Sequence, residues 1–116
     1  MNQPISKSVL SEPQSRLVEL LQRINFGRVE RLLVKGGVPL FEPAPRVIQK
    51  LKMGGDNTPR PETELQDFFL KRPIFEMLQA ISDLGEGVVL SIDIKHGLPF
   101  AIEVEGQVEA GGLGHA

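Results

Sequence analysis

The sequence predicts a small α+β domain built from two helix-plus-β-hairpin (αββ) units that share one core. Three observations predict it: a helical apolar period ahead of each of two strand–turn–strand patterns, a resemblance between the two halves, and a length of 116 residues, which suits one modest core. An isolated hairpin is at best marginally stable, so the units are expected to pack together. The domain is assigned to residues 13–106, with unit one at 13–53, a loop at 54–61 and unit two at 62–106.

The first unit is expected to begin with a helix. Residues 1–12 are polar and lack periodicity, which indicates a disordered leader. Apolar side chains at positions 17–24 then recur at i, i+3, i+4 and i+7, the spacing of one helix face. Ser11 is a plausible N-cap and Gly27 a plausible stop signal.

The strands of the first unit follow directly. Residues 29–34 read as a strand, residues 35–37 as a three-residue loop and residues 38–42 as the return strand. Two prolines then interrupt the chain. Residues 46–53 form either a third strand or an extended arm, since Gln49 breaks their apolar alternation.

The second unit repeats this order. A helical period spans residues 62–83 and breaks at Pro73, which fits two short helices or one kinked helix. A hairpin is predicted at residues 88–104, with a three-residue loop that places Ile92 opposite Phe100. In that register one face of the first strand is wholly apolar, formed by Val88, Leu90, Ile92 and Ile94. Residues 107–116 are expected to form a flexible tail.

The two halves resemble each other, which predicts an internal duplication. Residues 17–24 share Glu, Leu, Gln and Ile in register with residues 74–81, at an offset of 57. Residues 34–40 share Lys, Gly and Pro with residues 94–100, at an offset of 60. The difference predicts three extra residues near positions 83–87 of the second unit.

The stretch Ile24-Asn-Phe-Gly-Arg-Val-Glu, followed by Val34-Lys-Gly-Gly, resembles the YezD-like family of very small uncharacterised bacterial proteins. The resemblance covers residues 17–52. It implies bacterial origin and a local fold of a short helix, an entry into a strand, a glycine turn and a basic end. The family brings no established activity. Pro39, Pro43 and Pro45 depart from its usual unbroken strand.

Charge is divided unevenly along the chain. Residues 16–60 carry nine basic and four acidic side chains (+5), whereas residues 61–116 carry three basic and ten acidic ones (−7). The halves could lie against each other or against a second copy, or the basic half could face an anionic partner. Pro39 and Pro99 cannot donate to a strand ladder, so their strands are expected at open sheet edges. Together these features predict a homodimer.

No constellation for catalysis is evident. The chain has no cysteine and only two histidines, which lack metal-ligand spacing, so no metal and no cofactor is predicted. Ser91 has no recognisable activating base, and the glycine-rich pieces lack the context of a phosphate loop. We therefore expect a protein that is not an enzyme. No targeting segment or membrane-length apolar run is present, and a cytoplasmic location is expected.

The function that fits these observations is a small non-enzymatic interaction or regulatory domain that associates with itself. The alternative is a nucleic-acid-binding protein that uses the basic half, although the second helix and hairpin are acidic and would repel phosphate. In either case the predicted contact surface is the basic stretch with the hairpin loop second, namely Arg46, Lys50, Lys52, Arg60 and His96.

Overall fold

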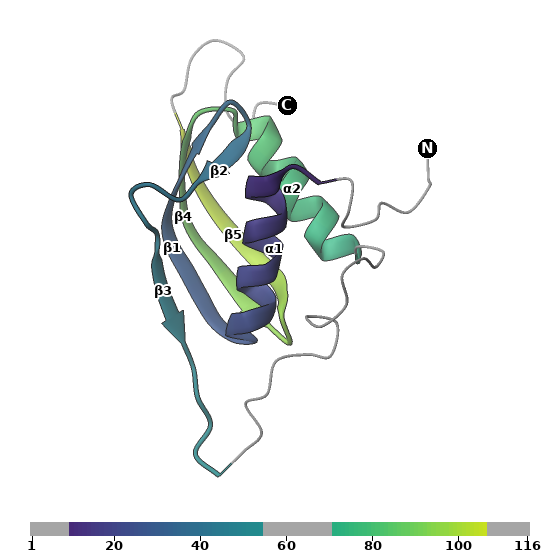
Figure 1. The fold of residues 1–116 in the computed structure, drawn as a ribbon, viewed down its shortest axis with the longest axis vertical. Coiled ribbons are helices and arrows are strands. Elements are labelled where there is room, and N and C mark those ends of the chain that lie inside the picture. The colour runs from purple at the N-terminus through teal and green to yellow at the C-terminus, as the bar shows by residue number, and fades with distance from the viewer. Residues whose placement is uncertain (1–9, 55–70, 107–116) are drawn as a thin grey trace.

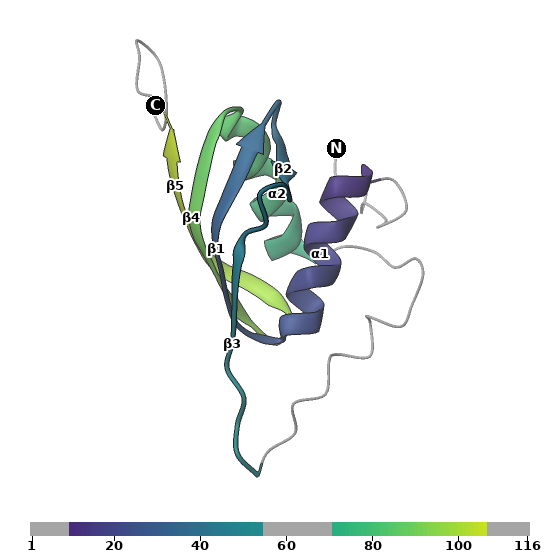
Figure 2. The same ribbon diagram turned by 60° about the vertical axis from the view of Figure 1, so that its left-hand side comes forward.

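The computed structural model describes residues 10–54 and 71–106, which form two helices packed against one antiparallel sheet (Figure 1). The α+β class is confirmed. The strand order is β2–β1–β4–β5, and β3 also pairs with β1. Both helices lie against the same face of the sheet, as the rotated view in Figure 2 shows. The elements are α1 (Glu12–Ile24), β1 (Phe26–Lys35), β2 (Val38–Leu40), β3 (Arg46–Gln49), α2 (Arg72–Leu84), β4 (Gly87–Lys95) and β5 (Leu98–Gly106).

The beginning of α1 is the one that the sequence predicts. The Ser11 side chain accepts from the Gln14 N–H, and the Gln14 side chain accepts from the Ser11 N–H, which completes a capping box. The predicted end of this helix is wrong, because the helix stops before Asn25 and Gly27 already belongs to β1. Asn25 takes a positive φ of 67° and its N–H donates to Leu21 O; asparagine is among the residues that tolerate such a backbone.

Both hairpins have two-residue turns, so the predicted three-residue loops are wrong. Lys35 pairs with Val38 across Gly36–Gly37, and Lys95 pairs with Leu98 across His96–Gly97. All four turn residues have positive φ, between 55° and 79°. Turns with two such residues match the right-handed twist of the flanking strands, which favours them over longer loops.

Two irregularities in the β4–β5 pairing keep an apolar face despite the shorter turn. Ile92 lies opposite Ile102, and the predicted pair with Phe100 is wrong. Phe100 falls at the register shift beside Ile94 and is 66% exposed. A second shift lies at Leu90, so that Val89 is buried while Leu90 is 37% exposed. Each extra residue changes which later side chains face the helices.

One core joins both units, as the sequence predicts. It lies between the helices and the central strands β1 and β4, and every strand residue in it comes from those two strands. The residues with no exposed surface are Leu17, Val18, Leu21, Val29, Leu32, Ile74, Val89 and Ile92. Partly buried residues of β5 extend the core toward one edge of the sheet.

Residues 46–53, which were expected to form either a third strand or an extended arm, contain both. β2 ends at Leu40, and β3 then pairs with the first half of β1, on the same side of β1 as β2. Only Arg46–Gln49 is a strand; residues 50–53 continue beyond it, past the end of the sheet (Figures 1 and 2). Pro39 and Pro99 lie on the outer strands β2 and β5, as expected.

The helices, helix C-caps and hairpin turns of the two units correspond at an offset of 60 residues. Both helices have 13 residues and begin at positions 12 and 72, which are 60 apart. Their C-caps, Asn25 and Gly85, and their hairpin turns are also 60 apart. The predicted helix offset of 57 is therefore wrong, because it aligned identical residue types rather than structurally equivalent helix positions.

The three-residue difference lies in the return strands. Val47 pairs with Val29 in the first unit, and Val104 pairs with Val89 in the second. The partners are 60 apart (29 and 89), but the return-strand residues are 57 apart (47 and 104). The extra residues therefore lie in the connection between β2 and β3, rather than near positions 83–87. The predicted helix at 62–71, most of the leader and the tail lie outside the described residues.

Candidate interaction surface

The open face of the sheet carries the charged side chains. Val29 and Ile92 pair with each other and are buried under the helices. Residues next to them in each strand point to the opposite face, because side chains alternate along a strand. Arg28 pairs with Asp93 on that open face, and Glu30 pairs with Ser91.

An ion-pair group occupies the middle of the open face. The Arg28 Nε lies 2.6 Å from Glu30 Oε2, and the Arg46 Nε lies 3.8 Å from Glu30 Oε1. The hydrogen bond from Arg28, aided by the charges of Arg28 and Arg46, lowers the pKa of the Glu30 carboxyl. The same hydrogen bond, together with the negative charge of Glu30, raises the pKa of Arg28. Arg46 is thus held by an acidic neighbour within its own chain.

A basic cluster surrounds Phe26 at the end of the sheet where β1 begins. The His96 and Phe26 rings meet edge to face with centroids 4.8 Å apart, and Lys52 Nζ lies 5.5 Å from the Phe26 ring centroid. Lys95 pairs with Phe26 across β1 and β4, and the Lys50 N–H donates to Phe26 O at 2.8 Å. We call these five residues the Phe26 cluster.

The side chain of Gln49 fixes the direction of Lys50. Gln49 Nε2 donates to Ile24 O at 3.0 Å and lies 3.5 Å from Arg23 O, so its side chain points toward the C-terminal end of α1. Because successive side chains alternate, Lys50 is placed on the open face with Lys95. At the end of β3, the Gln49 side chain therefore hydrogen-bonds the last carbonyls of α1 on one face of the sheet, and Lys50 lies on the other face.

The predicted contact residues are only partly brought together. Lys50, Lys52 and His96 meet in the Phe26 cluster, whereas Arg46 lies at the other end of β3 and contacts Glu30. Arg60 lies outside the described residues. Sequence reasoning missed Phe26 and Lys95 as members of the cluster. A signal existed: Phe26 is the first residue of β1, and the start of β1 lies beside the end of β4, and so beside the β4–β5 turn, when the two strands pair antiparallel.

The edge strand β5 is the acidic counterpart of this cluster. Ile102 and Val104 pair with buried residues of β4 and lie on the helix side. Glu103 and Glu105 alternate with them and are exposed. Among the described strands, only β4 pairs with β5, so the outer edge of β5 is open within that part of the chain.

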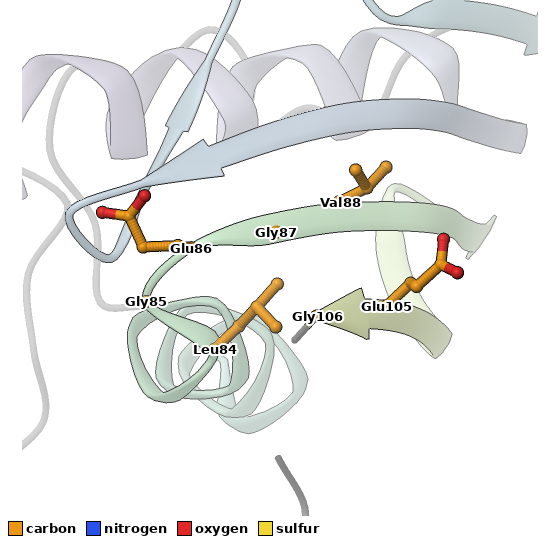
Figure 3. Close-up of a pocket in the computed structure, with 7 residues that line it drawn as sticks. All are labelled: Leu84, Gly85, Glu86, Gly87, Val88, Glu105 and Gly106. Carbon is orange, nitrogen blue, oxygen red and sulfur yellow. The ribbon is translucent and has the colours of Figure 1, made fainter. Parts of the chain in front are cut away.

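A shallow hollow of about 740 Å³ lies where α2 passes into β4 and β5 ends (Figure 3). Backbone of Gly85, Gly87 and Gly106 forms much of its wall. Glu86 and Glu105 line it too, but their carboxylates point away from each other (Figure 3). The polar groups do not converge on one point, so the hollow lacks the arrangement that fixes a small ligand.

Two searches of the described residues bear on other classes of site. In residues 10–54 and 71–106, no three His, Asp or Glu side chains gather closely enough to hold a metal ion. Within the same ranges, neither helix has the length and apolar character needed to cross a membrane. Comparison with models of protein families, with curated proteins and with solved structures finds no match to this chain. The resemblance to the YezD-like family stays a prediction.

Proposed function

We propose that this protein is a small non-enzymatic interaction domain that associates with copies of itself. The observation that carries the proposal is the opposite charge of the two outer sides of the sheet. The side formed by β3 and residues 50–53 presents Lys50 and Lys52, and the side formed by β5 presents Glu103 and Glu105. Complementary charge on two surfaces of one molecule favours encounters between copies.

The architecture supports self-association in a second way. Sheets with open outer strands tend to pair with further strands unless those strands are blocked. Pro43 and Pro45 interrupt the β2–β3 side, but β5 runs for nine residues with one proline near its start. A continuous edge of this length is therefore offered to a partner.

Sedimentation velocity of the full chain over a range of concentrations tests the proposal. We expect a mass of at least two copies at high concentration, and dissociation as salt is raised, because exposed charges are screened within about 10 Å at 0.1 M salt. A single-copy mass at every concentration up to about 100 μM would overturn the proposal, since it would place any Kd in a weak range.

Nucleic-acid binding is a second candidate, favoured by the Phe26 cluster. Lys52 and His96 lie at the Phe26 ring, and Lys50 and Lys95 flank Phe26 in the sheet, so these side chains could contact a phosphate backbone. In that case a labelled short DNA duplex or single-stranded RNA should bind at low salt. If three phosphates are contacted, log K should fall by about 2.7 for the duplex and by about 2.1 for the single strand for each tenfold rise in salt. Lys95→Glu should then weaken binding. If neither probe binds at low salt, this candidate is wrong.

An internal duplication also remains our proposal. Its support is the constant offset of 60 residues between helices, C-caps and turns. The pairing of β1 with β4 supports it as well, because Val29 opposite Ile92 has its equivalent in Val89 opposite Leu32. An ancestor of one unit would have paired its first strand with that of a second copy.

A further inference from the structure

We propose that residues 50–53 of one copy add as an antiparallel strand to the outer edge of β5 in a second copy. This inference rests on the proposed self-association and names the surfaces that carry it. We call residues 50–53 the basic arm. Addition of a strand to an open edge uses backbone hydrogen bonds for affinity and alternating side chains for specificity.

The basic arm carries large apolar side chains that its own chain leaves exposed. Leu51 is 52% exposed and Met53 is 86% exposed. They alternate with Lys50 and Lys52, the pattern of a strand with one apolar and one charged face. Within the described residues the strand pairing of β3 ends at Gln49, and the Lys50 N–H adds one backbone hydrogen bond to Phe26 O. Met53 lies in a turn with Gly54, so this turn must open for all four residues of the arm to pair with β5.

The side chains of β5 complement those of the arm in one antiparallel register. Placing Lys50 opposite Glu105 also places Lys52 opposite Glu103. The apolar residues then match too, with Leu51 opposite Val104 and Met53 opposite Ile102. Directly opposed opposite charges and directly opposed apolar side chains each stabilise a sheet.

Other registers match less well. A shift by one residue in either direction places each lysine opposite a valine, an isoleucine or a glycine and breaks all four pairs. A shift by two in one direction places Lys52 opposite Ala101 and leaves Glu105 without its lysine. The same shift in the other direction places Lys52 opposite Glu105, but it sets Leu51 opposite Gly106 and Lys50 beyond the end of β5. A parallel arrangement pairs both lysines with glutamates but sets Met53 opposite Gly106.

The arm cannot reach the β5 edge of its own sheet. β1 and β4 separate β3 from β5, so the two outer sides lie about 14 Å apart or more, at about 4.8 Å per strand spacing. The arm is anchored at its start by the Lys50 N–H bonded to Phe26 O. The three residues that follow span about 10 Å when extended, and the open side of β5 faces away from them. A basic arm that pairs with the outer edge of β5 must therefore come from a second copy.

Charge reversal followed by mixing tests this pairing. Lys50→Glu with Lys52→Glu should weaken association at least tenfold, because a glutamate arm then meets a glutamate strand. Glu103→Lys with Glu105→Lys should weaken it similarly. An equimolar mixture of the two variants should associate again, since each arm then meets a strand of opposite charge; sedimentation velocity measures all three samples.

Controls separate this effect from net charge and from misfolding. Lys35→Glu with Lys71→Glu makes the same change in net charge at two exposed residues outside the arm, and should leave association unchanged. Circular dichroism checks that each variant folds. If either charge variant does not fold, Leu51→Ser with Met53→Ser replaces it; this variant changes only exposed side chains and should weaken association about tenfold.

The failure of the pairing can be told apart from the failure of self-association. If the wild-type chain associates but the mixed variants do not regain that association, another surface joins the copies and the inference is wrong. If Leu51→Ser with Met53→Ser associates like the wild type, the inference is also wrong. If the wild-type chain stays a single copy throughout, the proposed function itself fails.

Discussion

The return strands of the two units solve the same pairing problem in different ways. In the second unit, β5 follows β4 along its whole length with two local irregularities. In the first unit, the return strand stops after Leu40, passes Pro43 and Pro45, and resumes as β3. Pairing is nevertheless equivalent at the buried valines of the central strands. Val47 lies opposite Val29, and Val104 lies opposite Val89. The buried strands therefore dictate the register, and the outer strands absorb insertions.

The difference between the units also separates their surfaces. The resumed strand β3 brings Gln49 against the end of α1 and carries the basic arm past the sheet. The continuous strand β5 ends at Gly106, which lies opposite Gly87. In the first unit the equivalent pair is Gln49 opposite Gly27. One unit therefore fills the space beside its helix end with an amide side chain, whereas the other leaves the hollow of Figure 3 there.

The largest expected effect on stability comes from Leu32 and Ile92, which occupy equivalent buried positions in the two units. Leu32→Ala and Ile92→Ala each empty an equivalent, fully buried position, so each should lower the free energy of unfolding by about 2–5 kcal/mol. Urea denaturation followed by circular dichroism measures this. Phe100→Ala is the control, and because Phe100 is mostly exposed its loss should be about 1 kcal/mol or less. A loss at Phe100 as large as that at Ile92 would contradict the observed register.

A second comparison concerns two glycines at which another strand passes closely. A Cβ at Gly27 would overlap Ile48 O, and one at Gly87 would overlap Glu105 O. Gly27→Ala and Gly87→Ala should each destabilise the fold by about 1–3 kcal/mol, measured by thermal or urea unfolding. Gly27→Ala should also weaken self-association, since it displaces the strand that carries the basic arm. Gly36→Ala is the control for a glycine with open space around it; there only the strain of its positive φ is expected.

The smallest expected effect distinguishes Gln22 from its equivalent, Ser82. Gln22 is 3% exposed, and no donor among the described residues reaches its Oε1. Gln22→Met keeps the shape and removes the unpaired amide oxygen, so it should stabilise the fold by about 1 kcal/mol, seen as a higher urea midpoint. Ser82 is exposed, and Ser82→Ala should change stability by no more than about 0.5 kcal/mol. Destabilisation by Gln22→Met would indicate that the amide has a role in the core.

Sequence periodicity was sufficient to predict the helices and the central strands, because the features that define them are local. The apolar stripe and the Ser11 cap are local features, so α1 and its start could be predicted. The single core followed from two amphipathic units that each leave an apolar face uncovered. The apolar alternation also located β1 and β4. Its predicted phase is correct for Ile92 and Ile94, which are buried, and wrong before the irregularity at Leu90, where Val89 is buried and Leu90 is exposed.

Register was not predictable, because it depends on irregularities that alternation hides. The two-residue turn would place the apolar rows on opposite faces of a regular hairpin, which argued for a longer loop. Extra residues at Leu90 and Phe100 change the phase, so a short turn and one apolar face coexist. The Phe26 cluster was predicted in part for a related reason. Its lysines and His96 are evident in the sequence, but their meeting at Phe26 requires the β1–β4 pairing.

Two backbone hydrogen bonds link the two units and should make their unfolding cooperative. The Gly37 N–H of the first hairpin turn donates to Gly85 O at the end of α2, and the Gly97 N–H of the second turn donates to Asn25 O at the end of α1, each at 2.9 Å. Fraying of one helix end thus removes support from the opposite turn, and a single cooperative melting transition is expected. Cleavage after residue 54 would yield two fragments that gain structure only when both are present.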